Sequence, residues 1–379
     1  SQLIIHAPRG SIYDRNHVLI AGSDGAYRLK QCDENNECQA NVISREQGLN
    51  LEAKGLPQGS TLEIDAQRFY PNKEATSHVL GYVSEITADE LGKMTQYNLG
   101  DRIGRSGIEE EYESVLRGID GKELIEVDAL GQKVRSLGIE PAKSGRDLEL
   151  TIDANLQKIA LNALDKRKGA VVVSNPQNGE ILALVSSPSF DNNSFTSLTF
   201  PRDKREQELE SIFNNPDLPM FDRAISGTFP PGSTFKIVVA AAGLESGKIT
   251  AETTIDDPGI LIIGPYKFPN WKYLQDGGRQ GILNVVGAIQ KSNDIFFYKL
   301  GGLIGDDSLF TYAKKFGLNS KLGIDLPGEA TGLVPDKKWR EQNGRSWYLG
   351  DTYHVAIGQG DLLVTPLQNN SWTSVVANG

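Results

Sequence analysis

Residues 227–244 read Gly-Thr-Phe-Pro-Pro-Gly-Ser-Thr-Phe-Lys-Ile-Val-Val-Ala-Ala-Ala-Gly-Leu, so a Pro-Pro-Gly turn runs directly into an apolar stretch. Proline is tolerated at the start of a helix, and this pattern therefore predicts a helix beginning there. Ser233 falls in the first turn, and Lys236 lies three residues later on the same helix face. The free N–H groups at a helix start favour negative charge developing on the serine oxygen.

This Ser-x-x-Lys spacing has two interpretations. A serine hydroxyl becomes a good nucleophile only when a base removes its proton, and a lysine can be that base only if burial lowers its pKa. The apolar residues after Lys236 provide such surroundings. The same spacing also fits a capping serine followed by a solvated lysine, so the chemical interpretation needs support from the rest of the chain.

Composition limits the class of protein. The chain has 379 residues, enough for two or more domains, and its 39% apolar and 23% charged residues are typical of folded proteins. A net charge of −10 without a basic stripe argues against nucleic acid as a partner. There is no continuous apolar stretch long enough to cross a bilayer.

The cysteines and histidines are few. Cys32 and Cys38 flank a polar, turn-forming pentapeptide, which fits a hairpin closed by a disulfide in an oxidising compartment, or else two free thiols. We expect no metal site and no cofactor, because the histidines lack ligand spacing: His6, His17, His78 and His354.

The residue pattern changes after a turn-rich segment at residues 141–145, which we interpret as a linker. Before it, short strands alternate with turns, and we expect the acids and arginines there to form a salt-bridged surface. After it, we expect strands at 148–152, 170–174 and 180–186. Helices should follow Asp153 and Asn284, span 295–300 and 307–317, and begin at Thr365. Residues 191–217 are polar and charged, and we expect a mobile surface segment.

The polar triplet Ser292-Asn293-Asp294 separates two apolar segments that we predict to be helical. It can be a simple helix cap. Alternatively, Ser292 relays a proton and Asp294 orients the substrate or the lysine.

Four motifs follow one another along the chain: Ser233-Thr234-Phe235-Lys236, Ser292-Asn293-Asp294, Gly350-Asp351-Thr352, and Gly358-Gln359-Gly360 followed by Thr365-Pro366. In this order they resemble the transpeptidase domain of class B penicillin-binding proteins. The start of the chain, Arg9-Gly10-x-Ile12-x-Asp14-Arg15, resembles the family's N-terminal signature, and residues 223–233 resemble the elongation-type, penicillin-binding protein 2-like branch.

The resemblance implies an α+β fold: an N-terminal, mostly-β pedestal domain at 1–143, which is not catalytic, and a serine transpeptidase domain of the penicillin-binding/β-lactamase type at 144–379. That second domain would have a central antiparallel sheet of five strands flanked by helices. The resemblance also implies a membrane-spanning helix upstream of Ser1, a glycan polymerase of the SEDS class as partner, and a position on the periplasmic face of the bacterial cytoplasmic membrane.

The implied activity is a peptidoglycan D,D-transpeptidase that cross-links stem peptides ending in D-Ala-D-Ala and is trapped by β-lactams. The implied catalytic residues are Ser233, Lys236, Ser292 and Asp294, and the implied substrate-binding residues are Asn293, Gly358, Gln359 and Gly360.

The chain departs from the family pattern in two places. Asp294 stands where many members have Asn, a variant that elongation-type members share. No Lys-Thr-Gly or Lys-Ser-Gly follows Gly360; residues 143–145 match the letters but precede the expected sheet. We therefore expect the chain to be C-terminally incomplete, ending before the third motif, and to be inactive as it stands.

Two other functions fit the same fold. One is a catalytically silent scaffold or β-lactam sensor, which would form no covalent adduct with a fluorescent penicillin. The other is a hydrolytic β-lactamase, which would release the adduct quickly. The long pedestal and the absence of an evident water-activating base make the β-lactamase the weaker alternative.

Overall fold

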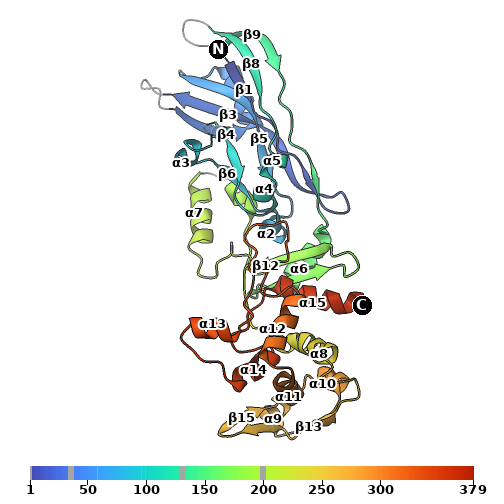
Figure 1. Ribbon diagram of the computed structural model, residues 1–379. Coiled ribbons are helices and arrows are strands. Elements are labelled where there is room, and N and C mark those ends of the chain that lie inside the picture. The colour runs from blue at the N-terminus through green and yellow to red at the C-terminus, as the bar shows by residue number, and fades with distance from the viewer. Residues whose placement is uncertain are drawn as a thin grey trace. The chain divides into compact units, whose positions relative to one another are not determined.

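The computed structural model describes residues 2–32, 38–57, 59–94, 96–98, 100–127, 133–196 and 202–379. They form two compact units, whose elements are labelled in Figure 1. Unit 1 holds Ser1–Val173, Glu180–Asp222 and Asp325–Pro327, and unit 2 holds Ser174–Gly179, Arg223–Ile324 and Gly328–Gly379. In the described part of the chain, no helix has the length and apolar character needed to cross a membrane.

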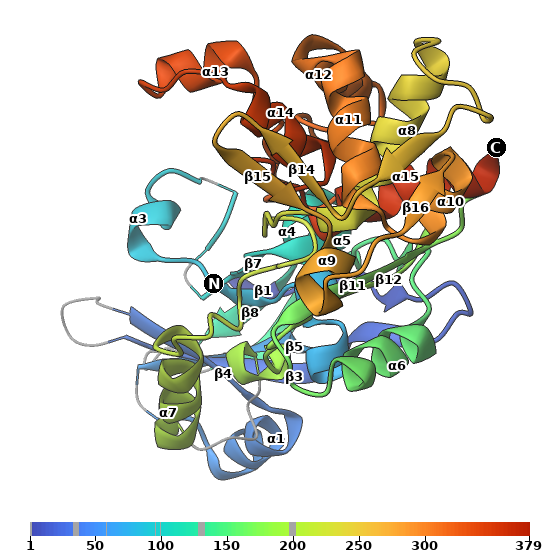
Figure 2. The ribbon, with the colours of Figure 1, turned by 90° about the horizontal axis from the view of Figure 1, so that it is seen from below.

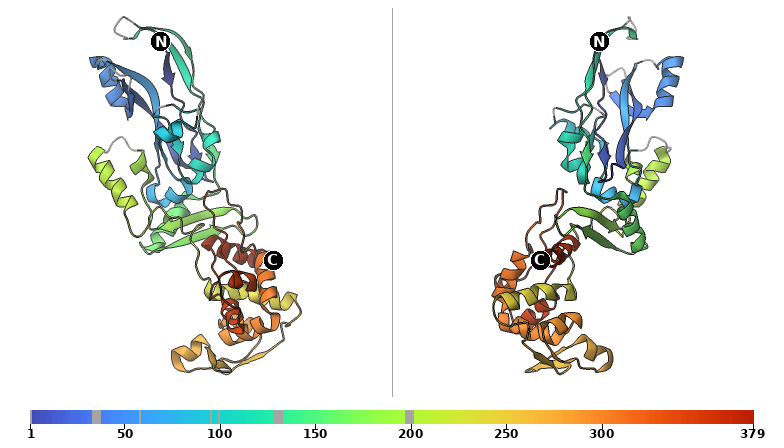
Figure 3. Two further views of the ribbon diagram at one scale, coloured as in Figure 1. Left: turned by 60° about the vertical axis from the view of Figure 1, so that its left-hand side comes forward. Right: turned by 90° about the vertical axis from the view of Figure 1, so that its right-hand side faces the viewer.

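Unit 1 is built on an eight-stranded sheet with the order β10-β2-β3-β5-β1-β8-β9 and with β4 paired to β3 (Figures 1 and 3). Its strands are β1 (Gln2–Ile5), β2 (Ile12–Tyr13), β3 (Leu19–Cys32), β4 (Cys38–Ser44), β5 (Ser60–Phe69), β8 (Gly121–Val127), β9 (Lys133–Glu140) and β10 (Leu148–Glu149). The long pairing of β3 with β5 runs antiparallel from Gly22 opposite Phe69 to Gln31 opposite Ser60. The mostly-β character expected for the N-terminal part is confirmed.

Short elements fill the connections of this region. They are α1 (Arg45–Lys54), η1 (Lys73–Ala75), α2 (Ser77–Leu80), β6 (Val83–Glu85), α3 (Ala88–Leu91), β7 (Arg102–Gly104), α4 (Gly107–Glu111) and α5 (Glu113–Leu116). The capping pattern at Thr87 is present as expected, because its hydroxyl accepts a hydrogen bond from the N–H of Glu90 while the Glu90 carboxylate accepts one from the N–H of Thr87.

Cys32 and Cys38 end the β3–β4 pairing directly opposite each other. Cys38 is disulfide-bonded. The side chain of Cys32 and residues 33–37 lie outside the described residues, so the hairpin tip that we expected between the cysteines is not described.

Several arginines and acids of unit 1 form ion pairs that are buried, and the expectation of a salt-bridged surface is wrong for these. Glu109 has no exposed surface, and its carboxylate binds Arg68 at 2.6 Å and Arg9 at 2.8 Å. The Tyr70 hydroxyl donates a further hydrogen bond to it at 3.2 Å. Burial would raise the pKa of Glu109, but the two guanidinium groups outweigh burial and lower it.

Residues 141–149 belong to unit 1 and are joined to its other segments by backbone hydrogen bonds. Ile119 and Lys143 form a two-way backbone bridge, and β10 pairs in parallel with β2. A Cβ on Gly145 would lie 1.8 Å from the carbonyl oxygen of Leu116, so only glycine allows this approach. The segment that we interpreted as a linker is therefore a close-packed connection.

The expected hairpin at 170–186 is present as β11 (Gly169–Ser174) and β12 (Ile181–Ser187), with β12 largely buried and β11 half-buried. The resemblance implied a sheet of five strands, whereas β11 and β12 form a two-stranded sheet in the described residues. Helix α6 (Ala154–Leu164) packs on β12, and Asp153 caps it by accepting hydrogen bonds from the N–H groups of Asn155 and Leu156.

The part of the chain expected to be a mobile surface segment, residues 191–217, contains a short turn, η2 (Asn192–Phe195), and a helix, α7 (Arg202–Phe213). Its residues 197–201 lie outside the described part. No apolar stripe marks α7 in the sequence, because the helix is polar around most of its circumference.

Unit 2 consists mainly of helices, which Figure 2 shows as a yellow, orange and red group. They are η3 (Gly232–Phe235), α8 (Lys236–Glu245), α9 (Trp271–Asp276), α10 (Val285–Gln290), α11 (Asp294–Ile304), α12 (Asp306–Lys315), α13 (Lys337–Gln342), α14 (Leu349–Ala356) and α15 (Pro366–Asn378). Two small sheets accompany them: β13 (Ile255–Asp257) with β16 (Gly281–Leu283), and β14 (Ile260–Ile263) with β15 (Tyr266–Pro269).

Helix α11 lies at the centre of unit 2 and packs against α8, α12 and α14. The core contains Phe235 and Val239 from the nucleophile segment and Phe296, Phe297 and Leu300 from α11, all at most 1% exposed. Because Lys236 and Asp294 stand at the first positions of α8 and α11, this packing brings their side chains together.

Candidate active site

Ser233 lies in the 3-10 turn η3 and is exposed, while Phe235 in the same turn is fully buried. The N–H of Lys236 donates to the carbonyl of Ser233, and α8 continues from Lys236. The prediction of a helical start at this point is confirmed. The exposed hydroxyl is therefore presented on a turn that the buried Phe235 and the following helix hold in place.

Lys236 is the buried cation of this site, with 2% of its surface exposed. Its Nζ donates to the backbone carbonyl of Ser292 at 2.8 Å, to the Ser292 hydroxyl at 3.3 Å and to Oδ1 of Asp294 at 2.6 Å. Burial lowers the pKa of Lys236, although the Asp294 carboxylate acts in the opposite direction. The three contacts use the three hydrogens of an ammonium group, so loss of one proton frees a lone pair.

The turn that carries Ser292 has an uncommon backbone conformation. Ser292 has a φ of 49°, in the left-handed region that few non-glycine residues adopt. This conformation lets both its carbonyl and its hydroxyl face Lys236 Nζ. Asp294 follows at the first position of α11, where the helix dipole favours a carboxylate.

The segment before Ser233 is held by the Gly358-Gln359-Gly360 motif. The N–H of Gly232 donates to the carbonyl of Gly358 at 2.8 Å, and Phe229 forms a two-way backbone bridge with Val364. Gly358 has a φ of 76°, and a Cβ on it would lie 1.9 Å from the carbonyl oxygen of Gly232. Glycine is therefore required there both for conformation and for space.

The predicted site residues thus fall into three groups. Lys236, Ser292 and Asp294 are in direct contact, and Ser233 lies one turn before Lys236. Gly358 is buried beside Gly232, whereas Gln359 and Gly360 are exposed. Asn293 is fully buried and its side chain faces into unit 2: its Nδ2 donates to Asp257 and Gln280, and its Oδ1 accepts from Phe296 N–H.

Four residues near the site were missed by the sequence reasoning: Asp257, Asn270, Trp271 and Gln280. The N–H of Trp271 donates to Oδ2 of Asp294 at 2.9 Å, and Asn270 Oδ1 accepts from the Asp294 N–H at 3.2 Å. These partners are 23 and 24 residues away from Asp294 in the sequence. No local spacing rule signals contacts of this range.

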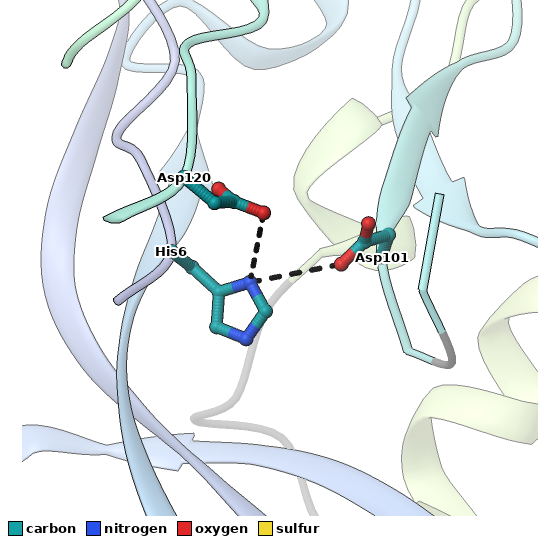
Figure 4. Close-up of side chains that lie close together, drawn as sticks. All are labelled: His6, Asp101 and Asp120. Carbon is teal, nitrogen blue, oxygen red and sulfur yellow. Dashed lines mark ion pairs between the residues drawn. The ribbon is translucent and has the colours of Figure 1, made fainter. Parts of the chain in front are cut away.

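A different cluster, in unit 1, has the residue types of a metal site: His6, Asp101 and Asp120 (Figure 4). Nδ1 of His6 lies 3.6 Å from Asp101 and 3.7 Å from Asp120, while Nε2 bonds to Glu63 at 3.1 Å. Burial would lower the pKa of His6, but Asp120 and Glu63 outweigh burial and raise it to about 9. Arg28 also pairs with Asp101, so the arrangement is that of a buried ion-pair network around a cationic histidine rather than of a ligand set.

Comparison with known protein families agrees with this geometry. Residues 169–379 match the penicillin binding protein transpeptidase domain, and residues 39–150 match the penicillin-binding protein dimerisation domain. The chain belongs to the penicillin-binding protein transpeptidase family.

Curated relatives point to one branch. The chain is 38% identical over 325 residues to the peptidoglycan D,D-transpeptidase MrdA of Acinetobacter baumannii and 37% identical over 321 residues to the protein of that name from Escherichia coli. These alignments cover 84% and 82% of this chain but 47% and 49% of the relatives. The chain thus spans about half the length of the curated relatives it matches.

Solved structures agree with the assignment to this branch. The complex of penicillin-binding protein PBP2 with MreC from Helicobacter pylori matches with a TM-score of 0.85 at 29% identity, covering 100% of this chain and 77% of that chain. PBP2 of Pseudomonas aeruginosa in complex with WCK 5153 matches with a TM-score of 0.76 at 32% identity, covering 100% and 70%. The α+β fold with a pedestal-like and a transpeptidase part is confirmed by these matches.

Proposed function

We propose that the protein containing this chain is a peptidoglycan D,D-transpeptidase of the elongation type, with Ser233 as its nucleophile and Lys236 as the base. The observation that carries the proposal is the buried Lys236, held by Ser292 and Asp294 one turn after an exposed serine. A lysine whose only role was solubility would not be buried with a lowered pKa.

The first half of the reaction forms an acyl-enzyme. Neutral Lys236 takes the proton from the Ser233 hydroxyl while the oxygen attacks the carbonyl carbon between the two D-alanines of a stem peptide. The C–N bond then breaks, and Lys236 returns the proton to the leaving amine of D-Ala through the Ser292 hydroxyl, which lies 3.3 Å from Nζ. Asp294 fixes the amine in place throughout and takes no proton.

In the second half, the amine of another stem peptide attacks the ester carbonyl and Ser233 regains its proton as the cross-link forms. A β-lactam would open on Ser233 in the same way, but its leaving group stays attached and the ester persists. We assign substrate contacts to Gln359 and Gly360, which are exposed beside the nucleophile segment, and to the backbone of Gly358.

The wider role is also a proposal. The relatives' name and the titles of the matching structures, which describe PBP2 with MreC and a peptidoglycan synthase complex coordinating polymerization and crosslinking, support stem peptides as substrate and a glycan polymerase of the SEDS class as partner. They also support a place on the periplasmic face of the cytoplasmic membrane and a role in cell shape. The family matches at 39–150 and 169–379 support a division into two domains, which we place at 1–143 for the pedestal and 144–379 for the transpeptidase domain.

The test is covalent labelling by a fluorescent penicillin in the full-length protein. We expect a stable adduct on Ser233, found by mass spectrometry of the labelled peptide, and none in Ser233→Ala. Ser246→Ala is the matched control, because it removes a hydroxyl from the other end of the same helix segment, where it bonds to Ala242. No adduct in the unmodified protein would favour the silent scaffold, and an adduct that hydrolyses within seconds would favour the β-lactamase.

A further inference from the structure

Asp257, at the end of β13, is a carboxylate buried to 2% exposure, with no cation paired to it among the described residues. Its Oδ1 accepts from the N–H of Gly259 at 2.6 Å. Its Oδ2 accepts from the side-chain amides of Asn270 and Asn293, both at 2.8 Å, and from the N–H of Gln280 at 3.1 Å. Four donors satisfy a charge that would otherwise be too costly to bury.

The two asparagines are linked a second time. Both Nδ2 groups also donate to Oε1 of Gln280, at 3.1 Å from Asn270 and 2.7 Å from Asn293. We call Asp257, Asn270, Gln280 and Asn293 the amide network. It ties together the end of β13, the N-cap of α9, the residue before β16 and the N-cap of α11.

The amide network reaches the proposed catalytic residues through Asn270 and its neighbour. Asn270 Oδ1 accepts the N–H of Asp294, and Trp271 N–H donates to Oδ2 of the same aspartate. This leaves Oδ1 of Asp294 for Lys236 Nζ. Each oxygen of the carboxylate therefore has one assigned partner, and the side chain cannot rotate without losing both.

We infer that the amide network is a positioning device for the acylation step, and that Asn293 acts through it rather than by touching substrate. The inference rests on the proposed function. Asn293 has no exposed surface, and its amide and its carbonyl oxygen are all engaged inside unit 2. It lies between Ser292 and Asp294, so fixing its side chain fixes the two residues that hold Lys236.

A merely structural role would give a different result. In that case, loss of the network would lower the folded fraction, while the molecules that remained folded would acylate normally. In a positioning role, the folded molecules acylate slowly because the base is misplaced; a displacement of about 1 Å can lower a rate about 100-fold. Binding of the penicillin before the chemical step should change little.

The experiment uses Asn293→Ser and Asn270→Ala in the full-length protein. Serine at 293 keeps an oxygen that can cap α11 but removes the amide donor. Asn284→Ala is the matched control, because Asn284 caps the neighbouring helix α10 by accepting from Gly287 N–H and has no link to the network. Gln280→Leu, at a half-buried position, is a second network variant that does not depend on the survival of the two buried asparagine variants.

Labelling by fluorescent penicillin is followed over a range of concentrations to separate the limiting acylation rate constant from the half-saturating concentration, and the end point gives the active fraction. We expect the limiting rate constant of the network variants to fall about 10- to 100-fold with little change in half-saturation, and that of Asn284→Ala to stay within twofold of the unmodified protein. Network variants that acylate at the unmodified rate would overturn the inference while leaving the proposed function intact. An unmodified protein that forms no adduct would instead refute the proposed function, and the inference with it.

Discussion

Replacing Gly358 by alanine should disable the site without touching any of the four proposed catalytic side chains. Alanine at a φ of 76° costs about 1–2 kcal/mol relative to an ordinary backbone conformation. The added Cβ would lie 1.9 Å from the carbonyl oxygen of Gly232, 2.6 Å from its carbonyl carbon and 2.8 Å from its nitrogen. All three atoms are backbone, so no side chain can turn away to make room.

The backbone must therefore separate by about 1 Å, and overpacking of this kind costs about 1–3 kcal/mol. The total destabilisation is about 2–5 kcal/mol. The hydrogen bond from Gly232 N–H to Gly358 is lost, and Ser233, the next residue, moves with Gly232. We expect acylation by a fluorescent penicillin to be about 100-fold slower in the molecules that remain folded.

The control is Gly247→Ala. Gly247 follows the last turn of α8 with a φ of 67°, and a Cβ there would meet no atom within 4 Å. This variant should show only the conformational cost, about 1–2 kcal/mol by urea unfolding, and should acylate normally. If Gly358→Ala acylates within twofold of the unmodified protein, the contact with Gly232 does not position the nucleophile and the reasoning fails.

Three further predictions follow from the buried charges. Lys236→Arg keeps the charge but cannot lose a proton, so acylation should fall by about 1,000-fold or more at every pH. In the unmodified protein, the acylation rate should rise with pH as Lys236 is deprotonated and should level off below the usual lysine pKa of about 10.5. Stopped-flow labelling from pH 6 to 10 measures both. Glu109→Gln leaves Arg68 and Arg9 without their shared buried carboxylate and should cost about 3–5 kcal/mol in urea unfolding, with no such cost for the exposed Glu111→Gln. Because the pKa of His6 is raised to about 9, its ion pairs stabilise the fold fully below about pH 6.5, and this stabilisation is lost as the pH rises through about 9. The melting temperature of the unmodified protein should therefore fall between pH 6.5 and 9.5, and His6→Asn should make this fall smaller. An unchanged slope in the variant would contradict the assignment.

Local rules predicted the beginnings of helices well. Asp153, Asn284 and Thr365 each accept hydrogen bonds from the first turn of the helix they precede, as their residue types and positions indicated. The link between Ser233 and Lys236 could also be predicted, because three-residue spacing on a helix is a local property. The resemblance of the ordered motifs to the family then identified Ser292 and Asp294 as candidate catalytic residues.

Features that depend on distant partners were not predictable in this way. The ring of bonds around Asp257 joins residues up to 36 positions apart, and none of them carries a pattern of its own. The polar helix α7 gave no amphipathic signal. Likewise, arginines in a turn-rich stretch look like surface residues until the fold brings Glu109 between two of them.

The cluster of Arg9, Arg68 and Glu109 has a consequence for how this part of the protein can change over time. Changing Glu109 leaves Arg68 buried without its carboxylate, and changing either arginine removes one of the two cations that hold Glu109. Replacing all three by well-packed apolar residues can be neutral or even stabilising. Single substitutions in the cluster thus lower the stability of the protein, although replacement of all three residues is tolerated. These positions are far apart in the sequence but should be inherited together. A chimaera that takes Arg9 from one relative and Glu109 from another should fold stably only if both parents carry the same pair.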